Sequence, residues 1–74
     1  MKNKLELWTI DELMSMICTI AILKYDGHFS ILSFTTHYKG GFNTYTKKDD
    51  ISELPAYSSL KELLIEMIKP EIKC

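Results

Sequence analysis

The sequence predicts an α+β fold: a three-stranded antiparallel meander with an N-terminal and a C-terminal helix, in the order α-β-β-β-α. Apolar residues recur at helical spacing near both ends of the chain, and β-branched and aromatic residues dominate the stretch between them. The dipeptides Asp26-Gly27 and Gly40-Gly41 divide that stretch at two points where tight turns are expected. We expect residues 1–74 to form a single small domain, since this length permits only one core.

The first helix is expected from about Ile10 to Met16. Residues 9–12 match a capping box, in which Thr9 caps the helix and Glu12 reaches back to it. An apolar stripe at i, i+3, i+4 and i+7 follows, formed by Ile10, Leu13, Met14 and Ile17. No Gly or Pro marks the end of this helix, so residues 15–19 could belong to the helix or to the following strand.

The predicted meander spans Ile17 to Thr46. Asp26-Gly27 is typical of a two-residue type I′ hairpin, because Gly adopts a positive φ without steric cost. Pairing across this turn gives a ribbon that is apolar on both faces, and one face carries Ile20, Ile22, Phe29 and Ile31. Gly40-Gly41 is expected to be the second turn, with residues 42–46 as the third strand.

The last helix is expected to begin at Leu60 and to stop at Pro70. Ser59 and Glu62 stand at capping-box spacing, and an amphipathic stripe follows, formed by Leu60, Leu63, Leu64, Met67 and Ile68. If both helices pack on the same face of the sheet, an apolar sheet face is left exposed.

That exposed face predicts a non-catalytic protein-binding or regulatory module, which acts as a homodimer or with a larger protein partner. We expect an interface with an apolar centre and a polar rim. The centre would be formed by Ile20, Ile22, Phe29 and Ile31, and the rim by Tyr38 and Lys39.

Nucleic-acid binding is the alternative, through the sheet face with Lys39, Lys47, Lys48 and Tyr45. The composition argues against it. All nine basic residues are Lys and the net charge is −1, whereas Arg is the preferred residue for forked contacts to phosphate and guanine.

Two resemblances concern the order of elements rather than a motif. The helix-strand-strand-strand-helix order resembles that of double-stranded-RNA-binding domains, but residues 58–62 contain a single Lys where those domains have a basic cluster. The stretch from Ile20 to Phe34, together with the last helix, loosely resembles the antitoxin halves of bacterial toxin-antitoxin pairs. Neither resemblance carries enough residues to transfer a role or to assign a family.

A cysteine-dependent enzyme is the third interpretation. The predicted register makes Cys18 and His37 diagonal neighbours, which is the minimal arrangement for a nucleophile, and Cys74 or His28 would be needed to complete a metal site. Because a Cys within a strand is usually a small apolar residue, we expect neither catalysis, metal nor cofactor.

The expected location is the cytoplasm, without membrane association. Two cysteines in a chain that lacks a secretory signature indicate free thiols in a reducing compartment. The abundance of Lys and Ile without Arg indicates a bacterial or viral genome rich in A and T.

Overall fold

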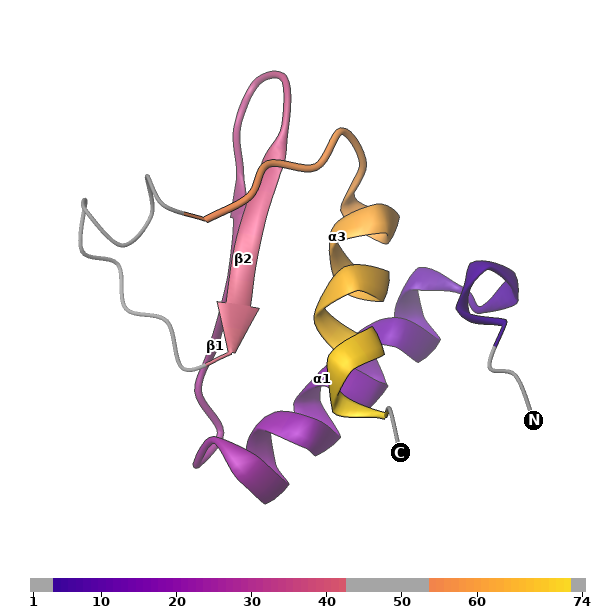
Figure 1. The fold of residues 1–74 in the computed structure, drawn as a ribbon, viewed down its shortest axis with the longest axis vertical. Helices are drawn as coiled ribbons and strands as arrows, with labels where there is room; N and C mark the ends of the chain where they lie inside the picture. Colours follow the sequence, from indigo (N-terminus) through magenta and orange to yellow (C-terminus); the bar gives the residue numbers. More distant parts are fainter. Residues whose placement is uncertain (1–3, 43–53, 73–74) are drawn as a thin grey trace.

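The computed structural model describes residues 4–42 and 54–72. The elements, in chain order, are the 3-10 turn η1 (Leu5–Leu7), helix α1 (Ile10–Lys24), strands β1 (Phe29–Ser33) and β2 (Tyr38–Phe42), helix α3 (Leu60–Ile68) and the 3-10 turn η2 (Lys69–Glu71). Both helices lie on the same side of the two-stranded hairpin, and α3 contacts β2 on one side and α1 on the other (Figure 1). The prediction of an α+β fold with an antiparallel sheet is therefore confirmed.

The predicted three-stranded meander is wrong, because residues 4–42 and 54–72 contain a sheet of two strands and the segment expected to form its first strand is helical. Helix α1 begins at Ile10 as predicted, with both hydrogen bonds of the capping box formed between Thr9 and Glu12. It then continues to Lys24, and no Gly or Pro interrupts it over this length. The residues it buries recur at i, i+4, i+7 and i+8: Leu13, Ile17, Ile20 and Ala21.

Asp26-Gly27 ends this helix instead of joining two strands. Both residues have the positive φ that the sequence predicts, 56° for Asp26 and 81° for Gly27. The backbone N–H groups of Tyr25 and Gly27 both donate to the carbonyl of Ala21, each at 2.8 Å. The Gly27 N–H therefore adds a second hydrogen bond to a carbonyl in the last turn of the helix, as the chain leaves the helix through the left-handed conformation.

The hairpin turn lies at residues 34–37, between Ser33 and Tyr38, which pair with each other. The N–H of Phe34 donates to the carbonyl of His37 at 2.9 Å and closes this loop. The predicted turn at Gly40-Gly41 is wrong, since both glycines lie within β2.

Gly40 lies where β2 packs against α3. It pairs with Ile31 and is buried. A Cβ atom at this position would contact the carbonyl oxygen of Ser30 and would lie 3.3 Å from Cδ2 of Leu63. The absence of a side chain therefore lets α3 pack directly on the hairpin.

At the far edge of β2, Tyr38 pairs with Tyr57 of the segment that precedes α3. Tyr38 and Tyr57 exchange two backbone hydrogen bonds, of 2.8 and 2.9 Å. The predicted third strand, residues 42–46, begins at the last residue of β2 and otherwise lies outside the described residues.

Helix α3 is confirmed from Leu60 to Ile68, and Pro70 lies in the 3-10 turn that follows it. The Ser59 hydroxyl accepts from the N–H of Glu62 at 3.1 Å, while the Glu62 carboxylate accepts from the Ser58 hydroxyl at 3.2 Å instead of returning to Ser59. The core forms where α3 meets α1 and η1, and its members are Leu5, Leu13, Ile17, Ile20, Leu63, Leu64, Ile65, Met67 and Ile68.

Candidate protein-binding surface

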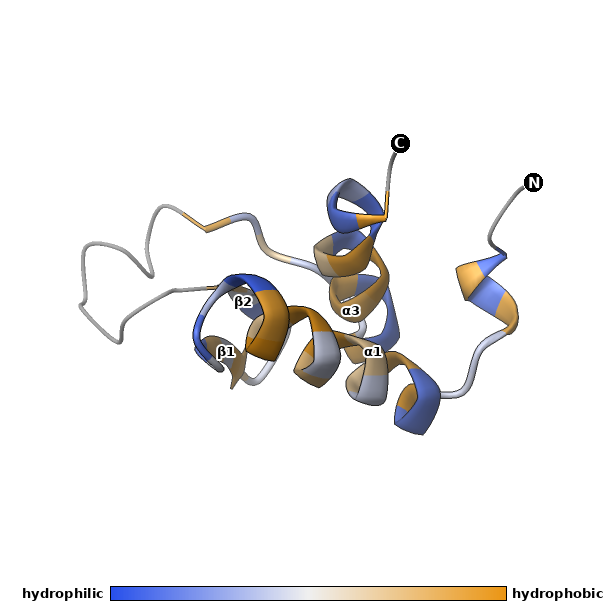
Figure 2. Ribbon diagram, turned by 90° about the horizontal axis from the view of Figure 1, so that it is seen from below, coloured by the Kyte–Doolittle hydropathy of each residue, from blue (hydrophilic) through white to orange (hydrophobic). Residues whose placement is uncertain are grey.

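The side of α1 that faces away from α3 is uncharged over most of its length. We define the α1 outer face as its exposed residues between Glu12 and Lys24: Ser15, Cys18, Thr19, Ile22 and Leu23. Figure 2 shows α1 orange to nearly white between blue ends. By contrast, the exposed side of α3 and its C-terminal turn carries Glu62 and Lys69, as expected for an amphipathic surface helix.

Two large apolar side chains stand at the C-terminal end of the α1 outer face. Ile22 is 70% exposed and Leu23 is 77% exposed, although Ile20 and Ala21 beside them are buried. A single exposed Leu or Ile is ordinary in a soluble protein. Two neighbours on a helix face without charge form an apolar patch, which is the kind of feature that marks an interaction site.

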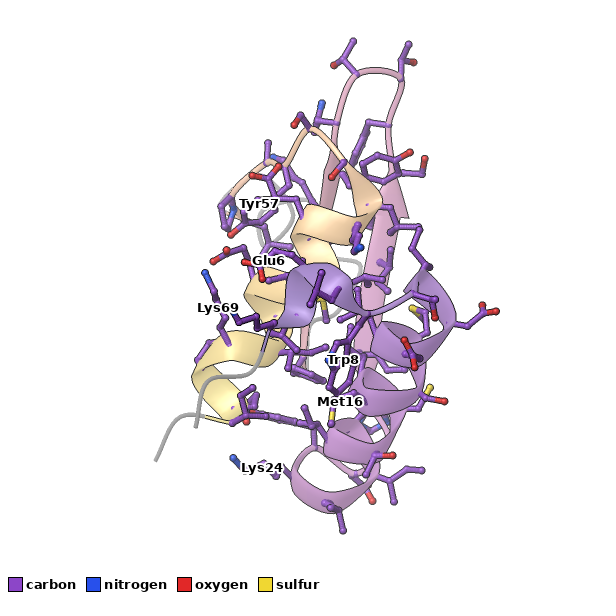
Figure 3. The ribbon with its side chains drawn as sticks, turned by 90° about the vertical axis from the view of Figure 1, so that its right-hand side faces the viewer. Glu6, Trp8, Met16, Lys24, Tyr57 and Lys69 are labelled. Atoms are coloured by element: carbon purple, nitrogen blue, oxygen red, sulfur yellow. The ribbon has the colours of Figure 1, made fainter. Side chains whose placement is uncertain are left out.

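A surface hollow of about 510 Å³ opens on the same side of the helix, near its N-terminal end. It is lined by Trp8, Asp11, Glu12, Ser15, Met16 and Thr19. Trp8, in the connection between η1 and α1, lies beside Met16 (Figure 3). Both side chains are half-buried, so the hollow has an apolar wall.

Two of the polar side chains around this hollow, Glu12 and Thr19, are hydrogen-bonded within the chain. The Glu12 carboxylate accepts from the backbone N–H of Thr9 at 2.7 Å, as part of the helix cap. The Thr19 hydroxyl donates to the carbonyl of Ser15 at 3.0 Å, one turn earlier. A partner could therefore cover Thr19 without leaving its hydroxyl donor unpaired.

The best-connected ionisable cluster lies elsewhere and joins three elements. Glu71 of η2 accepts from Lys24 Nζ at 2.8 Å and from the Tyr25 hydroxyl at 2.7 Å, and the Tyr25 ring stacks on Phe42 of β2 with centroids 4.9 Å apart. The hydrogen bonds from Lys24 and then Tyr25 lower the pKa of Glu71 below its usual value. The same bonds to Glu71 raise the pKa of Lys24 and the pKa of Tyr25.

The structure distributes the predicted interface residues over different surfaces. Ile20 is buried in the core, at 7% exposure, while Ile22 lies on the α1 outer face. Phe29, Ile31 and Tyr38 are half-buried and pack against the core from the sheet. Lys39 alternates with Tyr38 and so lies on the opposite face of the sheet. The strand register that placed these residues together does not exist, because Ile20 and Ile22 are helical.

The other predicted sites also depend on that register. Cys18 is an exposed free thiol on α1, whereas His37 lies in the hairpin loop at the end of the sheet away from α1 (Figure 1). The expected Cys18–His37 neighbourhood is therefore wrong. The His37 ring instead stacks on Phe34, with centroids 4.7 Å apart, and its Nδ1 lies 3.1 Å from the Thr36 hydroxyl.

The remaining predicted residues do not form a site within the part of the chain that the structure describes. Lys47, Lys48, Tyr45 and Cys74 lie outside the described residues, and His28 follows the turn after α1. Within residues 4–42 and 54–72, no group of three or more His, Cys, Asp or Glu side chains is placed to hold a metal ion. No helix in those two ranges combines the length and apolar character needed to cross a membrane.

Comparison with known proteins gives no match to any family model, to any curated protein or to any solved structure. The α1 outer face is therefore interpreted from its own geometry. The sequence analysis missed it by treating residues 20–24 as a strand and leaving residues 15–19 open between helix and strand. The signal was present, since Leu13–Leu23 contains no charged residue although a surface helix needs an apolar stripe on one side only.

Proposed function

We propose that this chain is a non-catalytic protein-binding module that docks onto another protein through the α1 outer face. The observation that carries the proposal is the combination of Ile22 and Leu23, 70% and 77% exposed, with a helix that has no charge from Leu13 to Leu23. Two large apolar side chains exposed side by side on an uncharged helix face form the kind of patch that marks an interaction site. Covering this face requires a partner that presents an apolar surface of its own.

The arrangement of ionisable groups supports a binding role over a catalytic one. Lys24, Tyr25 and Glu71 satisfy one another and hold α1, β2 and η2 together, so their hydrogen-bonding capacity is used for structure. The exposed free thiol of Cys18 suits a reducing compartment, and we place the action of the module in the cytoplasm.

The test is capture of partners from the cell of origin with a tagged chain and with the double variant Ile22→Lys, Leu23→Lys. Both side chains point into solvent, so the variant should fold, and far-UV circular dichroism checks this. The control is Phe34→Lys, which changes an apolar side chain of 41% exposure in the hairpin loop, away from α1.

We expect proteins that are bound by the wild type and by the Phe34 control to be lost from the double variant, as measured by quantitative mass spectrometry. An untagged copy of the chain is co-expressed with the tagged one, so that self-association is detected in the same experiment as a bound protein. An unchanged set of bound proteins in the folded double variant would refute binding through this face.

A further inference from the structure

We infer that the far edge of β2, which faces away from β1, binds an extended segment of another protein by strand addition, with a basic side chain of that segment facing Glu66 and Glu71. This site is separate from the α1 outer face, so the inference goes beyond the proposed function and does not depend on it. A peptide that joins a sheet edge gains affinity from backbone hydrogen bonds and specificity from alternate side chains.

The backbone of every second residue of β2 is directed toward this edge. Tyr38 exchanges two backbone hydrogen bonds with Tyr57 there. Because the direction of the backbone N–H and C=O groups alternates along a strand, those of Gly40 and Phe42 point the same way as those of Tyr38. The pairing with Tyr57 therefore shows how an antiparallel strand joins this edge, and Gly40 and Phe42 offer two further positions for it.

Pro55 prevents the segment before α3 from extending this pairing to Gly40. In the register of Tyr38 and Tyr57, Gly40 would lie opposite Pro55, and proline has no N–H to donate to the Gly40 carbonyl. Figure 1 shows this segment crossing β2 near the start of the strand instead of running along it. The Gly40 carbonyl therefore receives no donor from this segment, although an antiparallel strand would supply one at this position.

A cavity of about 320 Å³ lies between this edge and α3. The described residues that line it include Gly40 and Phe42 of β2, Leu63 and Met67 of α3, and Pro70 of η2. A strand added to β2 would lie about 4.8 Å from it, at the mouth of this cavity. Such a strand would have a hydrogen-bonding edge on one side and the apolar side of a helix on the other.

The two ends of the cavity differ in chemistry. Gly40 lies against Leu63, so a peptide side chain opposite Gly40 would meet an apolar surface. Phe42 stacks on Tyr25, whose hydroxyl donates to Glu71, so a side chain opposite Phe42 would face that carboxylate. In an antiparallel strand the residue opposite Phe42 comes two positions before the residue opposite Gly40. The preferred order is therefore a basic residue, any residue, and then an apolar residue.

The charge of the cavity favours a cation. Of the described residues that line it, the two that carry a charge are both acidic, Glu66 and Glu71. Each Glu71 carboxylate oxygen accepts one hydrogen bond, from Lys24 or from Tyr25, and has capacity for another. Glu66 contacts Lys69 at 3.3 Å on the surface, where such pairs are weak. A basic side chain of the peptide can therefore bind these carboxylates without displacing Lys24.

Binding of a synthetic peptide to the purified full chain, followed by amide chemical shifts in NMR spectra, tests the inference. The probe is a peptide of about seven residues, rich in threonine for its strand propensity, with a lysine followed two positions later by a valine. We expect saturable shifts of the Gly40 and Phe42 amides at submillimolar peptide. Unchanged amides at millimolar peptide would overturn the inference. A peptide with the lysine and the valine exchanged should bind more weakly, and equal affinity would overturn the antiparallel order.

N-methylation of the peptide backbone tests strand addition itself. A methyl group on the nitrogen of the valine removes the donor to the Gly40 carbonyl, so we expect binding to weaken by about ten-fold or more. The matched control is a methyl group on the residue before the valine, whose N–H points away from β2. Equal effects of the two methyl groups would overturn strand addition.

Two charge-reversal variants test the acidic wall. Glu66→Lys should weaken binding of the lysine peptide by about three- to ten-fold. Asp11→Lys makes the same change of charge in the first turn of α1, away from this cavity, and should leave binding unchanged. Equal binding to the two variants, with folding checked by circular dichroism, would overturn the role assigned to the carboxylates.

The double variant Ile22→Lys, Leu23→Lys separates this site from the proposed function. We expect it to bind the peptide as the wild type does, because the cavity is lined by residues outside the α1 outer face. Loss of peptide binding in the folded double variant would place the peptide on α1 and overturn this inference. Retained peptide binding supports it, whether or not the capture experiment refutes the proposed function.

Discussion

Gly40→Ala should destabilise the protein, and the reason lies in the contact between the hairpin and α3. The new Cβ would meet the carbonyl oxygen of Ser30 on the paired strand and would lie 3.3 Å from the Leu63 side chain. Leu63 can move a methyl group by changing rotamer, but the Ser30 carbonyl is part of the β1–β2 backbone and cannot retreat without disturbing the pairing. The backbone contact therefore dominates the cost.

Overpacking of this kind costs about 1–3 kcal/mol, and the involvement of backbone favours the upper half of that range. A domain of this size has a total stability of roughly 4–11 kcal/mol, so a loss of about 2–3 kcal/mol would be a large fraction of it. One kcal/mol corresponds to about 4–8 °C in Tm for small domains, which predicts a fall of roughly 8–24 °C. Urea unfolding followed by circular dichroism gives the free energy, and calorimetry gives the Tm.

The sign of the effect decides whether the reasoning is correct. At a strand position with free space, replacing Gly by Ala reduces the entropy of the unfolded chain and stabilises by about 0.4–1 kcal/mol. An unchanged or increased stability of Gly40→Ala would therefore refute the close approach. Adding Leu63→Ala separates the two contacts, because a dominant backbone contact predicts that the two losses add to within about 0.5 kcal/mol.

Two further predictions concern the ends of α1 and its link to η2. Thr9→Ala removes the acceptor of the Glu12 N–H in the capping box and should lower the free energy of unfolding by about 1 kcal/mol in urea titrations; Thr9→Ser should restore most of it. The pKa of Glu71 is lowered in the folded protein, so its ionised form adds stability that is complete above the usual carboxyl pKa of about 4.3 and is lost as the pH falls through the folded pKa. The urea midpoint of unfolding, measured at a series of pH values, should therefore fall less at low pH in Glu71→Gln than in the wild type. An identical pH dependence in the variant would show that the Lys24–Glu71 pair contributes nothing.

The sequence by itself determined the features that depend on a few neighbouring residues. The caps at Thr9 and Ser59 lie where their hydroxyls accept from the N–H three residues later. Asp26-Gly27 has the left-handed backbone that the dipeptide favours, and α3 ends before Pro70. These are local signals, because the groups that satisfy one another are within a turn of the chain.

Only the tertiary structure decided what the stretch from Ile17 to Lys24 becomes. Its residues are nearly all apolar, so both a helical and a strand register bury a consistent set, and periodicity cannot choose between them. The helix prevails because it continues the stripe begun at Leu13 and packs Ile17 and Ile20 against α3. The apolar character that made the local pattern ambiguous also left Ile22 and Leu23 on the exposed face, and of the predicted apolar interface residues only Ile22 lies there.

The two glycines of β2 also show that a local sequence pattern can be overridden by long-range packing. Gly40-Gly41 favours a turn when its neighbours are ignored. In the folded chain Gly40 is a strand residue, and a side chain there would meet the backbone of β1 at Ser30 as well as the Leu63 side chain of α3. Strand pairing and the packing of α3 on the hairpin supply that information, which comes from residues 10 positions before and 23 positions after Gly40. Local turn chemistry thus fixed which backbone angles were allowed at Asp26-Gly27, while long-range packing fixed which segments pair and which face is left for a partner.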